Sequence, residues 1–233
     1  MRFSSFPGVF VSACGLLAAV SCLSAQPPAP EAPAPRVVQG IPPRTAPTEY
    51  ISQGTVGKIT IGAEFMGHSV PTPQATFTTE EYVCVEVGLF AAPGTKLVIK
   101  PEQFSLRVNG KKQALPSQAY ELIFHNLKDP EWEAAQAIKA VEKSKTSLNG
   151  SGGGGGGLGG GGQEDKPAPP KMKIEERRAM EAKVLKASFP EGDRPLPQAG
   201  LLYFQYGGKT KGLKSLELLY EGPAGKAAIA LQP

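Results

Sequence analysis

Residues 81–90 read EYVCVEVGLF, and this stretch decides the fold class. Its alternate positions carry only apolar side chains: Val83, Val85, Val87 and Leu89. Because successive side chains of a β-strand point to opposite faces of a sheet, this pattern predicts a strand with one face in a core. The opposite face is mixed, with Tyr82, Cys84 and Glu86, so we expect that face to be half covered.

Strand patterns continue on both sides of this stretch. The same alternation predicts strands at 57–68, 96–100, 103–108, 111–115 and 119–124. The dipeptide Asn109-Gly110 tolerates the positive φ angles of a type I′ turn, so residues 111–115 are expected to return along 103–108. Near the C-terminus, three more strands are predicted to form a meander, at 200–206, 213–220 and 226–231.

Two helical segments lie between these groups of strands. Asp129 is a favourable N-cap and Pro130 suits the first helical position, so a helix is predicted over 130–147. A second helix is predicted over 171–188, and a run of glycines at 150–162 separates the two. The apolar residues of the first helix recur at helical spacing, with Lys145 interrupting the pattern: Trp132, Ala135, Ile138, Val141 and Leu148.

The glycine run could separate two domains or lie within one. The C-terminal strands contain too few residues to build a core of their own without disulfides or a metal. They are therefore expected to complete the sheet that begins before residue 125. This argument predicts one domain over 51–233, interrupted by a helical insertion at 129–192 in which residues 148–170 are disordered.

The strand count predicts a mainly β protein. Seven or eight strands with this turn spacing are typical of an immunoglobulin-like β-sandwich, here with a two-helix insertion that carries the glycine-rich loop. In the order of residues 82–87, 104–108 and 200–204 the chain resembles telokin-like, immunoglobulin-like β-sandwich domains of exported bacterial proteins. The resemblance implies a non-catalytic binding or structural module. The helical insertion departs from it.

The N-terminus has the pattern of an export signal. Residues 1–25 combine Arg2, an apolar run at 9–20 and small residues near the end, which predicts a cleaved signal peptide and a periplasmic or extracellular protein. The alternative is a lipoprotein anchored through Cys22, although Ala19 stands where lipoprotein signals usually carry Leu. Residues 26–50 are rich in proline and are expected to form a disordered spacer.

The chain carries few residues suited to catalysis. Its net charge of +4 is small for 233 residues and does not indicate nucleic-acid binding. The two histidines, His68 and His125, lie in different predicted elements, so no metal site or cofactor is expected. Cys84 lies in mid-strand and is expected to be a packed, inert thiol. We therefore expect that the protein is not an enzyme. The alternative is a hydrolase that uses carboxylates of the helical segments.

Two surfaces are candidates for binding a partner. Lys111, Lys112, Lys209, Lys211 and Lys214 lie in predicted turns and could form one basic rim for lipid headgroups or acidic polysaccharide, or else serve only solubility. The helical face of Trp132, Ile138 and Val141 is expected to pack on the sandwich or, alternatively, to meet a partner. The sequence thus predicts an exported, non-catalytic module with a binding or structural role in the bacterial cell envelope, alternatively a lipid-anchored assembly factor. Another envelope protein or a polysaccharide is the expected partner of a binding role. No membrane-spanning segment is expected after removal of the signal.

Overall fold

The structure, a computed structural model, describes residues 39–148 and 171–233. The predicted signal peptide, Cys22, most of the predicted spacer and the glycine run lie outside the described residues.

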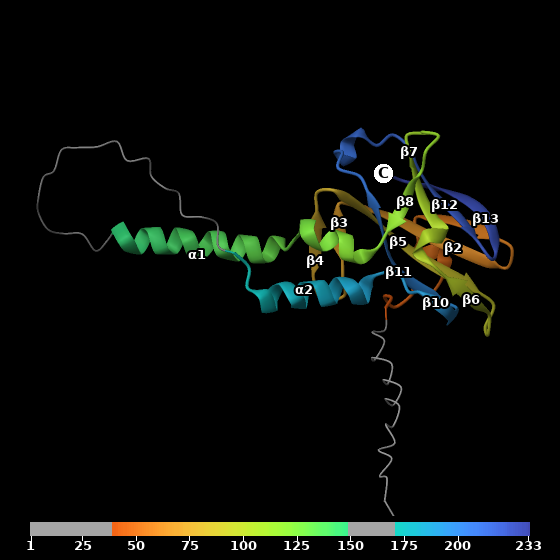
Figure 1. The fold of residues 1–233 in the computed structure, drawn as a ribbon, viewed down its shortest axis with the longest axis horizontal. Helices are drawn as coiled ribbons and strands as arrows, with labels where there is room; N and C mark the ends of the chain where they lie inside the picture. The colour runs from red at the N-terminus through yellow and green to blue at the C-terminus, as the bar shows by residue number, and fades with distance from the viewer. Residues whose placement is uncertain (1–38, 149–170) are drawn as a thin grey trace, which may run out of the picture. The chain divides into compact units, whose positions relative to one another are not determined.

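One large antiparallel sheet dominates the described part of the chain, which is mainly β as predicted (Figure 1). Alternating apolar residues form its strands because one face of each strand packs in the interior. Along the sheet, its eight strands are β1 (Ser52–Val56), β2 (Ile59–Gly67), β5 (Tyr82–Ala91), β11 (Gln198–Gln205), β8 (Leu115–Gln118), β7 (Phe104–Val108), β12 (Leu216–Gly222) and β13 (Gly225–Leu231).

The first and last strands of this sheet approach each other, so the sheet is barrel-like. A Cβ atom added to Gly54 of β1 would lie 2.7 Å from the Ile229 side chain of β13. At the adjoining turns, a Cβ atom on Gly57 would lie 2.8 Å from the carbonyl oxygen of Ala224. The predicted number of strands agrees with this sheet, whereas a two-sheet immunoglobulin-like sandwich is not confirmed.

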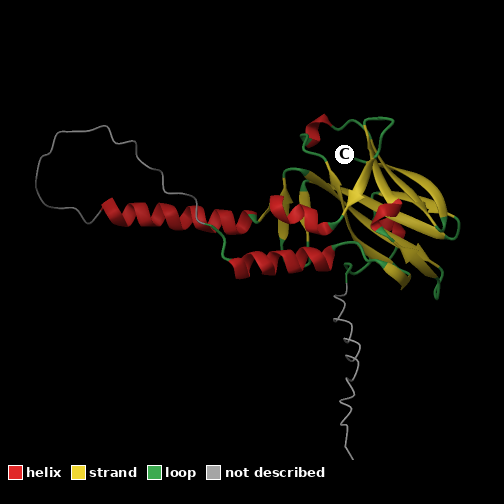
Figure 2. Ribbon diagram, in the orientation of Figure 1, coloured by secondary structure: helices red, strands yellow, loops and turns green. Residues whose placement is uncertain are grey.

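Smaller elements surround the barrel-like sheet (Figure 2). One small sheet consists of β3 (Ser69–Pro71), β4 (Thr76–Thr79) and β9 (Leu127–Lys128), and another pairs β6 (Lys96–Ile99) with β10 (Gly192–Pro195). The helices are α1 (Pro130–Leu148) and α2 (Ile174–Ala187), and short 3-10 turns are η1 (Pro47–Glu49), η2 (Pro101–Gln103), η3 (Tyr120–Asn126) and η4 (Thr210–Gly212).

Strand β5 is buried on both faces. Its predicted apolar face lies inside the barrel-like sheet with Phe104 and Phe204. Its other face was expected to be half covered, yet Tyr82, Cys84 and Glu86 are all buried. Helix α2 covers part of this outer face, and its buried side chains share a second core with Phe77 and Ile123: Met180, Val184 and Ala187.

Residues 40–50 lie on this outer face of β5, and we call them the strap. The proline content predicts that they belong to the spacer. The Gly40 N–H donates to the Lys186 carbonyl at 2.9 Å, and Ile41 forms a β-bridge with Ala199. The Tyr50 side chain packs directly on the backbone of Gly62 and Gly88. A Cβ atom on Gly62 would lie 2.4 Å from its ring, and a Cβ atom on Gly88 would lie 2.5 Å from its hydroxyl oxygen. The strap is therefore part of the folded domain.

Three predictions about individual elements are wrong. Residues 119–124 do not form a strand, because Tyr120–Asn126 is the 3-10 turn η3. The strand that returns along β7 begins at Leu115 rather than at residue 111. The C-terminal strands do not form a meander, because β11 pairs with β5 and β8 and lies apart from β12.

Helix α1 does not bury the face that its periodicity suggests. Ile138 and Val141 are 61% and 53% exposed, so they do not pack on the sheet as expected. Near the start of the helix, Asp129 accepts hydrogen bonds from the Glu131 and Trp132 N–H groups, both at 3.1 Å, as its predicted N-cap role requires. The sequence of α1 therefore determines where the helix begins, but Ile138 and Val141 of its apolar face remain on the surface.

Candidate functional site

Two loops that are far apart in the sequence meet at one end of the sheet. The turn after β7 contains Asn109 and Gly110, whose φ angles of 51° and 65° fit the predicted Asn-Gly turn. The Asn109 Oδ1 atom accepts hydrogen bonds from the Lys214 and Ser215 N–H groups at 2.7 and 3.2 Å. Its Nδ2 atom donates to the Gly212 carbonyl at 3.1 Å. One asparagine side chain therefore joins the turn after β7 to the loop between β11 and β12.

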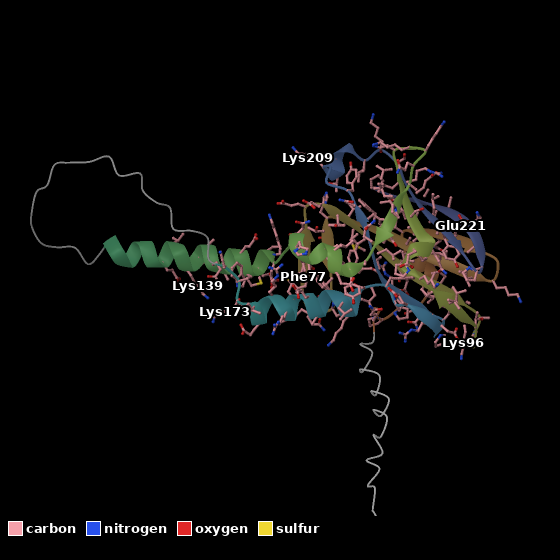
Figure 3. All side chains as sticks on the ribbon, in the orientation of Figure 1. Phe77, Lys96, Lys139, Lys173, Lys209 and Glu221 are labelled. Carbon is pink, nitrogen blue, oxygen red and sulfur yellow. The ribbon has the colours of Figure 1, made fainter. Side chains whose placement is uncertain are left out.

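The joined loops carry a group of lysines that we call the lysine rim. All are exposed: Lys111, Lys112, Lys209, Lys211 and Lys214. Neither 109–114 nor 206–215 contains a carboxylate, and no carboxylate among the described residues forms an ion pair with these lysines. The structure thus brings together the basic residues that the sequence placed in separate turns. Figure 3 labels Lys209 at η4.

His68 holds the same loop from the opposite side. Its Nδ1 atom lies 2.7 Å from the Tyr82 carbonyl oxygen, and its Nε2 atom lies 2.9 Å from the Gly208 carbonyl oxygen. A Cβ atom on the preceding Gly67 would lie 3.4 Å from the Thr210 side chain, so the two turns are in contact. The loop that carries Lys209, Lys211 and Lys214 is therefore held between Asn109 and His68.

This arrangement suits recognition of several negative charges at once. Lysine ammonium groups are compact charges on long, flexible side chains, and each can bind a carboxylate, sulfate or phosphate oxygen. Exposed like charges raise the local positive potential and attract polyanions over about 10 Å at moderate ionic strength. The rim has the character of an open charged surface rather than that of a closed pocket for one small ligand.

A separate pocket of about 220 Å³ gathers carboxylates near η3 and the end of α2. Burial, followed by the charges of Glu102 and Glu121, raises the pKa of Glu191 above its ordinary value. Deeper in the pocket, the Ser188 hydroxyl donates to the Val184 carbonyl at 2.8 Å and lies 3.2 Å from the Tyr203 hydroxyl. Ser188 thus donates its proton to backbone and has no general base beside it among the described contacts.

The remaining candidate for chemistry is the thiol of Cys84. Cys84 is completely buried, and burial, reinforced by the nearby Glu86 charge, raises the pKa of the thiol far above its ordinary value. A neutral, inaccessible thiol is a poor nucleophile. Within residues 39–148 and 171–233, no three His, Cys, Asp or Glu side chains lie close enough together to hold a metal ion.

The second candidate surface, on helix α1, is formed by different elements from those of the lysine rim. Trp132 is partly buried, and its Nε1 atom has no hydrogen-bond acceptor among the described residues. It lines a pocket of about 180 Å³ together with side chains of η3 and α2, including Phe124, Arg177 and Met180. Lys139 of α1 and Lys209 of η4 are well separated in Figure 3. The structure therefore contains two separate candidate surfaces.

The sequence analysis named the rim lysines but missed the two residues that hold their loop. The sequence predicts Asn109 only as a turn residue, and it places His68 at the end of a predicted strand without a role. Their roles depend on contacts 103 to 140 positions away along the chain, which local patterns do not report.

None of the described helices is long and apolar enough to cross a membrane. Comparison with protein-family models, curated proteins and solved structures finds no match to this chain.

Proposed function

We propose that this chain is an exported, non-catalytic binding module that holds an acidic polysaccharide of the bacterial cell envelope on its lysine rim. The observation that carries the proposal is the Asn109 side chain, which joins two loops with five exposed lysines and no carboxylate. Because β7 pairs with β12, the two loops lie at one end of the sheet, and the Asn109 side chain fixes them to each other. The joined loops hold several cations on one surface, as a polymer with repeated negative charges requires.

We further infer that the protein is exported and that its fold is related to known β domains. The signal pattern in residues 1–25 supports export, and Cys22 offers lipid anchoring as the alternative. The antiparallel sheet of eight strands is compatible with kinship to telokin-like, immunoglobulin-like domains, whose order of strand motifs the chain resembles. Such domains suit a role in binding or structure.

The test compares two variants of equal net charge on an acidic polysaccharide such as polygalacturonate. The rim variant is K111Q/K112Q/K209Q/K211Q, and the matched control is K58Q/K96Q/K100Q/K139Q, which removes four exposed lysines elsewhere. Because each lysine near a dense anionic surface contributes roughly 1 kcal/mol, removing four of them should weaken binding by the rim variant about 1,000-fold at low salt.

The control variant should lose only the small, long-range part of the attraction. Equal losses in the two variants would mean that binding follows net charge, and the rim would then have no special role. Binding by the wild type should also weaken steeply as salt is raised, because exposed charges are screened.

A second candidate function is binding of another envelope protein by α1. The observation that favours it is the 61% exposure of Ile138, an apolar side chain that α1 leaves on the surface. An apolar helical face of this kind suits a groove on a protein rather than a polysaccharide. Mapping which backbone amides shift when the ligand binds separates the two surfaces.

A further inference from the structure

We propose that His68 makes binding at the lysine rim pH-dependent, so that a polyanion binds more tightly at mildly acidic pH. This inference concerns regulation of the rim and rests on the proposed function. It starts from the position of the imidazole between the carbonyl oxygens of Tyr82 and Gly208, at 2.7 and 2.9 Å.

Both ring nitrogens of His68 face hydrogen-bond acceptors. A neutral imidazole carries one N–H group, so it donates to one carbonyl and turns a lone pair toward the other. The imidazolium carries two N–H groups and donates to both carbonyls. Protonation therefore completes a clamp between the start of β5 and Gly208, and charge strengthens both hydrogen bonds.

The clamp acts directly on the rim. Gly208 precedes Lys209, and the turn before His68 contacts Thr210 of η4. The far side of the same loop is already held by Asn109. When His68 donates to Gly208, the loop is fixed at both ends, so less conformational entropy is lost when Lys209 and Lys211 bind a polymer.

The charged groups on the elements packed around His68 have partners of their own. On β2, Glu64 pairs with Arg44 at 2.8 Å. Before β5, Glu80 pairs with Lys128 at 2.6 Å, and Glu81 accepts a hydrogen bond from Asn126 at 2.7 Å.

The loop opposite His68 carries the rim lysines, and the remaining titratable neighbours are Tyr82, Cys84 and Tyr206, of which Cys84 is completely buried. An imidazolium at His68, held between the Tyr82 and Gly208 carbonyls, adds its positive charge to that of the rim.

The experiment measures binding of dextran sulfate at pH 5.5 and pH 7.5 and constant ionic strength. The sulfate esters stay ionised at both values, so a change in affinity belongs to the protein. We expect the wild type to bind about fivefold more tightly at pH 5.5, a coupling of ordinary size.

The two histidines of the chain supply a matched pair of variants. In H68Q the side chain has no titrating group, so the ratio of the two affinities should fall to about one. In H125Q the ratio should stay as in the wild type, because His125 is an exposed residue of η3 outside the clamp. An unchanged ratio in H68Q, or a lost ratio in H125Q, overturns the proposal.

Amide hydrogen exchange of the free protein tests the clamp itself, even if no polymer binds. After correction for the intrinsic pH dependence of exchange, amides 207–212 should be more protected at pH 5.5 than at pH 7.5 in the wild type and equally protected in H68Q. Equal protection in the wild type overturns the clamp. No polymer binding at either pH, with pH-dependent protection intact, overturns the proposed function but supports the clamp. A circular-dichroism melt shows that each variant is folded.

Discussion

At the scale of single residues, the strap depends on Arg44. Its Nε and Nη2 atoms donate to the two carboxylate oxygens of Glu86 at 3.1 and 3.0 Å, and Nη1 pairs with Glu64 at 2.8 Å. The guanidinium also lies 4.3 Å from the centre of the Tyr50 ring. Because Glu86 is buried, Arg44 supplies the charge that makes its burial tolerable.

Replacing this arginine should therefore be costly. We expect R44A to lower the free energy of unfolding by about 3 kcal/mol, the lower end for a broken buried pair because the Arg44 side chain is 27% exposed. R107A is the control, since Arg107 and Glu217 form an exposed pair at 2.8 Å, and it should cost less than about 1 kcal/mol. Urea denaturation measures both values, and similar losses would contradict this account of the strap.

At the scale of elements, the two loops of the rim depend on each other through Asn109. In N109A the backbone groups of Gly212 and Lys214 lose their side-chain partner. Both groups lie in exposed loops where water can replace that partner, so we expect a loss of stability of about 1 kcal/mol or less.

Polymer binding should also weaken in N109A. In N109A the pairing of Val108 with Leu216 and the bond from the residue-109 N–H to the Ser215 carbonyl still join the bases of the two loops, so only the loop tips gain freedom. We therefore expect the affinity for an acidic polysaccharide to fall about twofold to threefold. N109G removes the same side-chain contacts and adopts the φ of 51° without strain, so it is the matched variant and should show the same loss of affinity. Thermal melts and binding isotherms of the two variants check this, and an unchanged affinity in N109A would contradict the joining role.

The elements that could be predicted are those that depend on contacts between residues close together in the sequence. Residues 81–90 could be assigned because alternation is a local signal, and the start of α1 followed from Asp129 and Pro130. The strand expected at 111–115 was displaced because Asn109 is held by Gly212 and Lys214, contacts that no local pattern contains. Likewise, burial of Glu86 depends on Arg44, 42 residues away.

At the scale of the whole molecule, β11 connects the two halves of the chain. It lies between β5 and β8, and its Tyr203 pairs with Cys84 on one side and with Gln118 on the other. The sequence predicted that the C-terminal strands complete the N-terminal sheet, but not that one of them enters its middle. Insertion of a strand between two others is a long-range event that periodicity cannot report.

This topology makes a strong prediction about truncation. A chain that ends at residue 148 lacks β11, β12 and β13, so β5 loses one neighbour and β7 and β8 lose most of their sheet. We expect it to be unfolded, with no cooperative thermal transition and little dispersion of amide shifts in an NMR spectrum. A cooperatively folded fragment would contradict a single domain over the described residues.

The most direct test of the proposed function is to map the bound polymer on the wild-type protein by NMR. Amide shifts are recorded as a short oligogalacturonate is added at low salt. The account predicts that the largest changes fall in residues 109–112 and 208–214 and disappear at high salt. Changes centred on α1 around Trp132 and Ile138, or on the pocket of Glu121 and Glu191, or no changes at all, would contradict it.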